Sequence, residues 1–208
     1  MKYDFPMIVP AIWVRMRDGF SRVVGRVRAL WLSFWWGVNI GHGCRFQGRT
    51  IIRTRHRGDI VVGDSVVLNS DLRANLVGIT NPTVLDVRGG GKIIIGDNSG
   101  ATSVIIHSRS SVTIGSKVKI GGNVRIFDHD FHSLEPQYRT SNEDQDHIRT
   151  KPIVIGDACF IGTNAILLKG TELGDRTIVA AGSVVHGLKS PPDSLVKGNP
   201  AFIVRRYA

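Results

Sequence analysis

Residues 153–185 read IVIGDACFIGTNAILLKGTELGDRTIVAAGSVV, and an aliphatic residue recurs in this stretch at every sixth position. Gly or Ala follows most of these aliphatics, and a small residue stands four places after each of the first five. This period fits neither a helix nor an ordinary alternating strand. It is typical of a solenoid of short strands and tight corners, whose coils must stack to bury one aliphatic per side. The aliphatic positions are Ile155, Ile161, Leu167, Leu173, Val179 and Val185.

The same pattern occurs upstream, at Ile114, Ile120 and Ile126, with weaker copies beginning at Ile40, Val62 and Ile95. A β-sandwich with chance spacing does not account for six consecutive matches. Both cysteines, Cys44 and Cys159, fall at the small-residue position of the repeat, which favours buried structural residues over nucleophiles or ligands.

The repeat stops after Ile126 and resumes at Ile155, and the polar loop FDHDFHS (127–133) lies in the gap. Long excursions from a solenoid usually carry function. The gap holds three of the seven histidines, His129, His132 and His147. A histidine takes up a proton near neutral pH, and a neighbouring carboxylate such as Asp128 or Asp130 can orient its ring. The loop therefore contains candidates for a general base.

The 153–185 run, the loop FDHDFHS and the closing VKGNPAFIVRR (196–206) together resemble the hexapeptide-repeat acyltransferases. The resemblance is to the branch of galactoside, maltose, xenobiotic and surface-polysaccharide acetyltransferases, and it covers about residues 38–206. It implies an all-β, left-handed parallel β-helix that assembles as a homotrimer. It also implies acetyl transfer from acetyl-CoA to a hydroxyl or amine of a sugar, in polysaccharide or lipopolysaccharide biosynthesis, with no metal.

The resemblance also assigns site residues. It places the catalytic base on His129, with His132 as a rival and with Asp128 or Asp130 orienting the base or contacting the acceptor. Beyond the last coil, a Thr-Lys pair of the family is replaced by His186-Gly187, so that a phosphate contact would have to come from Lys189. The acyl-CoA contacts implied by the resemblance are Gly162, Thr163 and Ala181. Lys189, Arg205 and Arg206 are further candidates for phosphate contacts, although a solvated basic terminus fits Arg205 and Arg206 equally well.

Two other functions fit the same repeat. One is a zinc enzyme like the carbonic anhydrases of this solenoid type, with His107, His129 and His132 as ligands. That family places two histidines five apart in one segment, whereas the gap here is three. The other is a β-helix without catalytic activity that serves as a scaffold.

Residues 8–36 have a different pattern, with apolar residues at the three-and-four spacing of an amphipathic helix and arginines on its other faces. Tryptophans and arginines in such a helix fit the interface of a membrane. Packing against the solenoid or a neighbouring subunit fits equally well. The apolar positions are Trp13, Met16, Phe20, Val23, Val27, Leu30, Trp31 and Phe34.

The chain of 208 residues has a formal charge of +10, which indicates an anionic partner. No nucleic-acid-binding motif accompanies the charge, so nucleic acid is not expected. Two distant cysteines favour a reducing compartment, and arginines interrupt every apolar run. We expect a cytoplasmic protein, resting on the inner face of the bacterial membrane if residues 8–36 bind lipid. The expected segments are a basic helix (1–37), a β-helix (38–186) with a protruding loop (127–152), and a tail (187–208).

Overall fold

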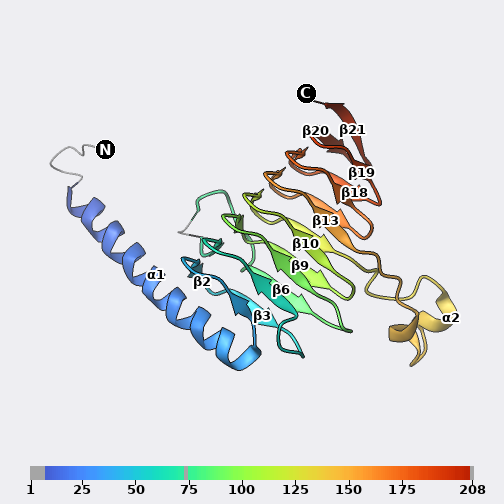
Figure 1. Cartoon of the computed structure of the whole chain (residues 1–208), viewed down its shortest axis with the longest axis horizontal. Coiled ribbons are helices and arrows are strands. Elements are labelled where there is room, and N and C mark those ends of the chain that lie inside the picture. The colour runs from blue at the N-terminus through green and yellow to red at the C-terminus, as the bar shows by residue number, and fades with distance from the viewer. Residues whose placement is uncertain (1–7, 73–74, 207–208) are drawn as a thin grey trace.

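The computed structural model describes residues 8–72 and 75–206, which form one long helix and a β-helix (Figure 1). Three parallel sheets, named A, B and C here, make the sides of the solenoid within these residues. Sheet A contains β1 (Asn39–Ile40), β4 (Ile60–Val62), β7 (Ile93–Ile95), β10 (Val112–Ile114), β13 (Ile153–Ile155), β16 (Glu172–Leu173) and β19 (Lys189–Ser190).

Each coil of the chain passes through sheets A, B and C in turn, so that consecutive strands never pair with one another except at the last hairpin. Sheet B contains β2 (Arg45–Gly48), β5 (Val67–Ser70), β8 (Gly100–Thr102), β11 (Lys119–Ile120), β14 (Phe160–Ile161), β17 (Ile178–Val179), β20 (Ser194–Gly198) and β21 (Ala201–Arg206). Sheet C contains β3 (Ile51–Arg53), β6 (Val84–Val87), β9 (Ile105–Ser108), β12 (Arg125–Phe127), β15 (Ile166–Leu168) and β18 (Val184–His186).

The six-residue period places one buried aliphatic on each side of the triangular core. Ile155 pairs with Leu173 in sheet A, and Leu167 pairs with Val185 in sheet C. These side chains are buried, and the small residues four places on fill the core between them. The buried small residues of this stretch are Cys159, Ala165, Thr171, Thr177 and Ser183.

A glycine directly after the buried aliphatic lets successive coils approach closely. A Cβ built on Gly162 would lie 2.4 Å from the backbone nitrogen of Ala181 in the next coil, which no real side chain tolerates. The left-handed conformation that turns each corner falls two residues later, at Ala158 (φ 54°) and Asn164 (φ 60°). The glycine is therefore required for close approach rather than for its positive φ.

The helix α1 (Ile8–Trp36) packs on β1 and β2 with its C-terminal half, and its N-terminal half extends away from the solenoid (Figure 1). Gly25 lies against the backbone of Phe46, and the side chains of Ala29 and Leu32 are buried there. Arg57 donates a hydrogen bond to the carbonyl oxygen of Phe34 in the last turn. Packing against the solenoid, one of the two arrangements that the sequence allowed, is thus observed for one face of the helix.

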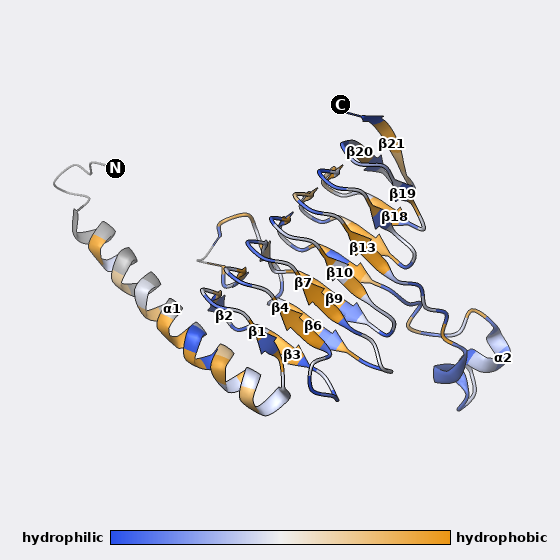
Figure 2. Cartoon of the chain, viewed as in Figure 1, coloured by the Kyte–Doolittle hydropathy of each residue, from blue (hydrophilic) through white to orange (hydrophobic). Residues whose placement is uncertain are grey.

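Many large apolar side chains of α1 are exposed. In Figure 2 the apolar positions of the helix are coloured orange. Within residues 8–72 and 75–206, no helix is long and apolar enough to cross a membrane. At the other end of the solenoid, β21 turns back and pairs antiparallel with β20. Between β12 and β13 a loop with α2 (Pro136–Arg139) and a 3-10 turn, η2 (Asp144–His147), projects from the side (Figure 1).

Candidate active site

The loop between β12 and β13 leaves the solenoid at the corner between sheets C and A, and its two ends run side by side. The Lys151 amide donates to the carbonyl oxygen of Asp128 at 2.9 Å, and the Asp130 amide donates to that of Arg149 at 3.2 Å. His129 and Thr150 form an antiparallel bridge between these two bonds. This short ladder fixes the backbone of the histidine against the corner of the coil.

Asp128 and His129 form a buried pair. The His129 Nδ1 lies 3.0 Å from the Asp128 Oδ1, and their side chains are 2% and 0% exposed. The Asp128 carboxylate also accepts hydrogen bonds from the Ser108 hydroxyl and from the Arg109 and Ser110 amides, at 2.7–2.9 Å. Hydrogen bonds from the preceding coil therefore fix the Asp128 carboxylate, which in turn orients the His129 ring.

The electrostatics of Asp128 determine the tautomer of His129. Burial by itself raises the pKa of the Asp128 carboxyl, but its four hydrogen bonds outweigh burial and hold the pKa below the usual value. The carboxylate is therefore ionised at neutral pH and can only accept, so that the Nδ1 of His129 carries the proton. The Nε2 is left with a free lone pair, which is what a general base needs.

A second histidine lies beside this pair. The ring centroids of His107 and His129 are 5.0 Å apart, and the Nε2 of His107 lies 2.7 Å from the Asp86 Oδ2. Burial lowers the pKa of His107 more than the Asp86 carboxylate raises it, which favours a neutral ring. The Nδ1 of His107 is buried and has no hydrogen-bond partner among the residues that the structure describes.

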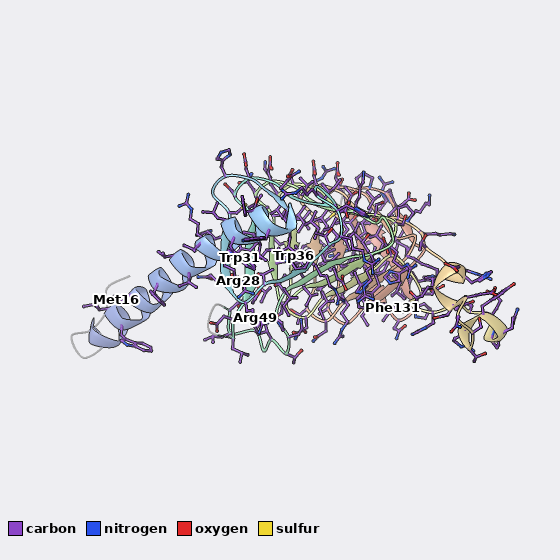
Figure 3. All side chains as sticks on the ribbon, turned by 90° about the horizontal axis from the view of Figure 1, so that it is seen from below. Met16, Arg28, Trp31, Trp36, Arg49 and Phe131 are labelled. Atoms are coloured by element: carbon purple, nitrogen blue, oxygen red, sulfur yellow. The ribbon has the colours of Figure 1, made fainter. Side chains whose placement is uncertain are left out.

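Phe131 covers the two histidines. Its ring centroid lies 4.4 Å from that of His129, 5.1 Å from that of His107 and 5.0 Å from that of Phe127. Phe131 has a φ of 66°, a conformation that a bulky residue rarely adopts and that costs of order 1–3 kcal/mol. Figure 3 shows it at the end of the molecule that carries the loop. Strain of this kind is concentrated at functional sites.

His132 and Asp130 have other partners. The Nδ1 of His132 lies 2.7 Å from the Asp144 Oδ2, and its side chain is 65% exposed. Asp130 forms an ion pair with Lys169 of the next coil. The structure thus brings Asp128 to His129 and separates both from His132, whose partner stabilises the outer part of the loop.

A groove of about 600 Å³ runs along the same corner of the solenoid, between the loop and the next two coils. Basic residues line it, although Glu172 lies 2.7 Å from the Lys189 Nζ and Arg149 pairs with Glu135. Its lining residues are Leu134, Arg149, Thr150, Lys151, Pro152, Lys169, Gly170, Glu172, His186, Gly187 and Lys189.

The residues implied as acyl-CoA contacts do not all lie near this groove. Gly162, Thr163 and Ala181 are at the corner between sheets B and C, because they follow β14 and β17. Lys189 lies on β19 in the groove, and Arg205 and Arg206 lie on β21. In one chain, sheet C separates the first three from His129. Their contact with acyl-CoA stays a prediction.

The zinc alternative groups His107, His129 and His132. Two of these rings are adjacent, whereas the third pairs with Asp144. In the part of the chain that the structure describes, 8–72 and 75–206, no group of three His, Cys, Asp or Glu side chains is arranged to hold a metal ion.

Asp128→Asn should lower the rate of a reaction that uses His129 as its base by about 10²–10⁴-fold, because an amide no longer enforces the Nδ1–H tautomer. Steady-state kinetics of the purified variant would measure the loss. The expected pattern is a fall in kcat with little change in KM for the acyl donor. A rate within twofold of the wild type would contradict this role of Asp128.

The same carboxylate makes stability depend on pH. The pKa of Asp128 is lower in the folded chain than the value of about 3.9 expected when unfolded. Between the two values the unfolded chain binds more protons, so this stabilisation is present above about pH 4 and is lost as the pH falls through the folded pKa. Urea unfolding at several pH values should show a weaker acid destabilisation in Asp128→Asn than in the wild type. If the free energy of unfolding changed with pH equally in the two proteins, this contribution of Asp128 would be contradicted.

The two cysteines differ in accessibility. Burial raises the pKa of the Cys159 thiol to about 11, whereas Cys44 is half-buried and lies 3.0 Å from the carbonyl oxygen of Gly63. We expect iodoacetamide at pH 8 to modify Cys44 well before Cys159 in the native protein, and both at similar rates in urea. Mass spectrometry of timed samples would detect this order, and early labelling of Cys159 would argue against its burial.

The repeat of this chain is shared with a family of known proteins. The family model described as "Hexapeptide repeat of succinyl-transferase" matches residues 92–127 and 152–186, the two blocks that flank the loop. The two blocks of the chain that this model matches thus consist of hexapeptide repeats. The resemblance expected from the sequence is thereby confirmed, and so is the fold class, a left-handed parallel β-helix with an N-terminal helix and a protruding loop.

Two curated relatives of this chain come from Escherichia coli (strain K12). The putative lipopolysaccharide biosynthesis O-acetyl transferase WbbJ is 34% identical over 128 residues, which cover 59% of this chain and 65% of the relative. Galactoside O-acetyltransferase is 31% identical over 117 residues, which cover 56% of this chain and 55% of the relative. The chain thus spans less than two thirds of the length of either relative.

A solved structure matches more of the chain than these relatives do. The hexapeptide-repeat-containing acetyltransferase VCA0836 from Vibrio cholerae has a TM-score of 0.59 and 25% identity, covering 94% of this chain and 91% of the other. The same enzyme complexed with acetyl coenzyme A has a TM-score of 0.56 and 24% identity, covering 99% and 93%.

Proposed function

We propose that the protein is an acyl-CoA-dependent acetyltransferase that acts on a hydroxyl or amine of a sugar, in the assembly of a surface polysaccharide or lipopolysaccharide. The observation that carries the proposal is the buried Asp128–His129 pair at the long break between β12 and β13 of a hexapeptide solenoid. The names of the relatives support the same chemistry, since they are O-acetyltransferases of lipopolysaccharide biosynthesis and of galactosides.

The reaction needs one base and a bound thioester. The Nε2 of His129 takes the proton of the acceptor hydroxyl while the oxygen attacks the thioester carbonyl. The C–S bond then breaks, and the departing thiolate takes the proton from the imidazolium. Asp128 is a positioning residue, because it fixes the tautomer and offsets the positive charge that develops on the ring. General-base catalysis of this kind contributes about 10²–10⁴-fold.

Access to the base requires a movement. The His129 side chain is only 2% exposed, and the neighbouring Phe131 side chain is the exposed member of the aromatic group. We assign to Phe131 the role of a cover that the acceptor displaces. A dry site strengthens the interaction between Asp128 and His129, because the dielectric constant there is low.

The donor site is completed by a second chain in this proposal. Gly162, Thr163 and Ala181 occupy one corner of the solenoid and His129 another, so a homotrimer in which the loop of one subunit faces the B–C corner of its neighbour would bring them together. The basic groove beside the loop suits the phosphates of coenzyme A, and Lys189 is one of its lining residues. Light scattering should give the mass of three 22.8 kDa chains.

Calorimetric titration with acetyl-CoA at low salt, beside free coenzyme A, tests the proposal directly. We expect saturable binding of about one acetyl-CoA per chain, followed by acetyl transfer when candidate sugars are screened. The absence of binding to either ligand would overturn the proposal and favour a scaffold without catalytic activity.

A further inference from the structure

The helix α1 has two apolar faces, and only one is covered. Gly25, Ala29 and Leu32 lie against the first coil. At 100° per residue, most of the exposed apolar residues fall within about 60° of the side opposite this covered face, whereas Trp35 lies about 90° from it and Trp36 lies on the covered side. The exposed positions are Trp13, Met16, Phe20, Val23, Val27, Leu30, Trp31, Phe34 and Trp35.

This exposed face is large and continuous. Met16, Phe20 and Phe34 are 70%, 72% and 69% exposed, and the face extends over most of the length of α1. A buried aromatic side chain removes about 150–250 Å² from water, so several of them exceed the apolar patch of a typical soluble monomer. The face is therefore an interaction surface rather than ordinary exposed residues.

The charge of the chain is concentrated around the same helix. Residues 1–57 contain eleven of the Lys and Arg residues and two of the acidic residues, so nine of the ten net positive charges lie there. Five of these arginines are on the first coil and exposed. Arg45, Arg49, Arg55 and Arg57 have no ion pair with a carboxylate among the described residues, whereas Arg53 is paired with Asp86 and does not count toward the free charge. Between Asp18 and Asp59 the sequence has no carboxylate side chain.

The helix and the nearby arginines are arranged in a way that fits a flat, negatively charged surface. In Figure 3, Arg28, Trp31, Trp36 and Arg49 are labelled where the helix meets the solenoid, whereas Phe131 lies toward the loop. A helix is about 10 Å in diameter, which is close to the Debye length at physiological ionic strength. Arginines on the coil behind the helix therefore still feel the potential of a surface that the helix touches.

We propose that the exposed face of α1 docks the protein on the surface of an anionic lipid bilayer, with the arginines of the first coil facing the headgroups. The apolar side chains enter the boundary between headgroups and acyl chains, and arginine stems lie along it with their charges in the headgroup layer. A neutral or apolar protein partner would not account for the accumulation of charge, whereas each Arg near an anionic bilayer contributes about 1 kcal/mol. None of the docking residues belongs to the loop site, so this surface is independent of the acyl-transfer proposal.

Flotation of the full-length protein with vesicles tests the docking. Vesicles of phosphatidylcholine with phosphatidylglycerol should bind the protein, phosphatidylcholine alone should bind it much less, and high salt should weaken binding. Met16→Glu with Phe20→Glu, on the half of α1 that extends from the solenoid, should lower the partition coefficient at least about tenfold. Leu76→Glu is the control, because Leu76 is 89% exposed on the segment between β5 and β6.

Three outcomes would overturn the proposal: no binding of the wild type to anionic vesicles, equal binding to both vesicle types, or equal binding of the double variant and the wild type. If the double variant also has a smaller mass by light scattering, the face is covered by a second copy of the chain instead. Acetyl-CoA titration of the double variant should match the wild type, which separates a failure of docking from a failure of the acyl-transfer proposal.

Discussion

His129→Ala should lower kcat for acetyl transfer by about 10²–10⁴-fold, the contribution of a general base, while the affinity for acetyl-CoA stays nearly unchanged. The expectation rests on the free Nε2 of His129 and on the ionised Asp128 that enforces it. Single-turnover kinetics with a competent sugar acceptor would separate the chemical step from binding. Circular dichroism would establish that the variant is folded.

His132→Ala is the matched control, because it removes the same side chain from the same loop. His132 is largely exposed and is paired with Asp144, so its loss should change kcat by less than about threefold and act mainly on the outer loop. If the two variants had equal activities, or if His132→Ala had the larger defect, the assignment of the base to His129 would be wrong.

Leu167→Ala should reduce the free energy of unfolding by about 2–5 kcal/mol, because it leaves a cavity in a core that the surrounding coils cannot close. The Leu167 side chain is completely buried in the third side of the triangular core. Urea unfolding followed by circular dichroism would give the loss. Because the coils stack in one dimension, the cavity should also lower the cooperativity of unfolding.

The next residue provides the control. Leu168 is the same residue type on the same strand but points outward and is only half-buried. Leu168→Ala should therefore cost less than about 1 kcal/mol. Similar losses for the two variants would mean that the six-residue phase read from the sequence does not decide which side chain is buried.

The repeat could be predicted from the sequence because its signal is local and recurs. The spacing of Ile155, Ile161 and Leu167 is visible in the sequence without any knowledge of the corners that join the strands. The buried positions of one coil therefore predict those of the next. The pairing of His129 with Asp128 was also accessible, because the two residues are neighbours in the chain. His129 as the base remains a prediction that the kinetics above must test.

The rest of the site depends on which coils are adjacent, and this cannot be read from one segment. Asp86 and His107 are partners across β6 and β9, in a register set by the length of every corner between them. Asp86 and His107 each directly follow a buried aliphatic residue. Aligning the coils on their buried aliphatics, and then comparing the outward-facing residues beside them, would have placed Asp86 and His107 at the same position. The strained φ of Phe131 and the groove along the corner have no local sequence signal.

The first and last coils bear on how the molecule avoids self-association. A stack of parallel strands leaves unpaired backbone groups at both ends, and an uncovered strand edge is a template for another chain. At one end α1 lies over β1 and β2, and at the other β21 folds back along β20. These two covers protect the edges of β1, β2 and β20 and so oppose the addition of further coils end to end. Deletion of 199–206 should therefore favour filaments before it affects the loop.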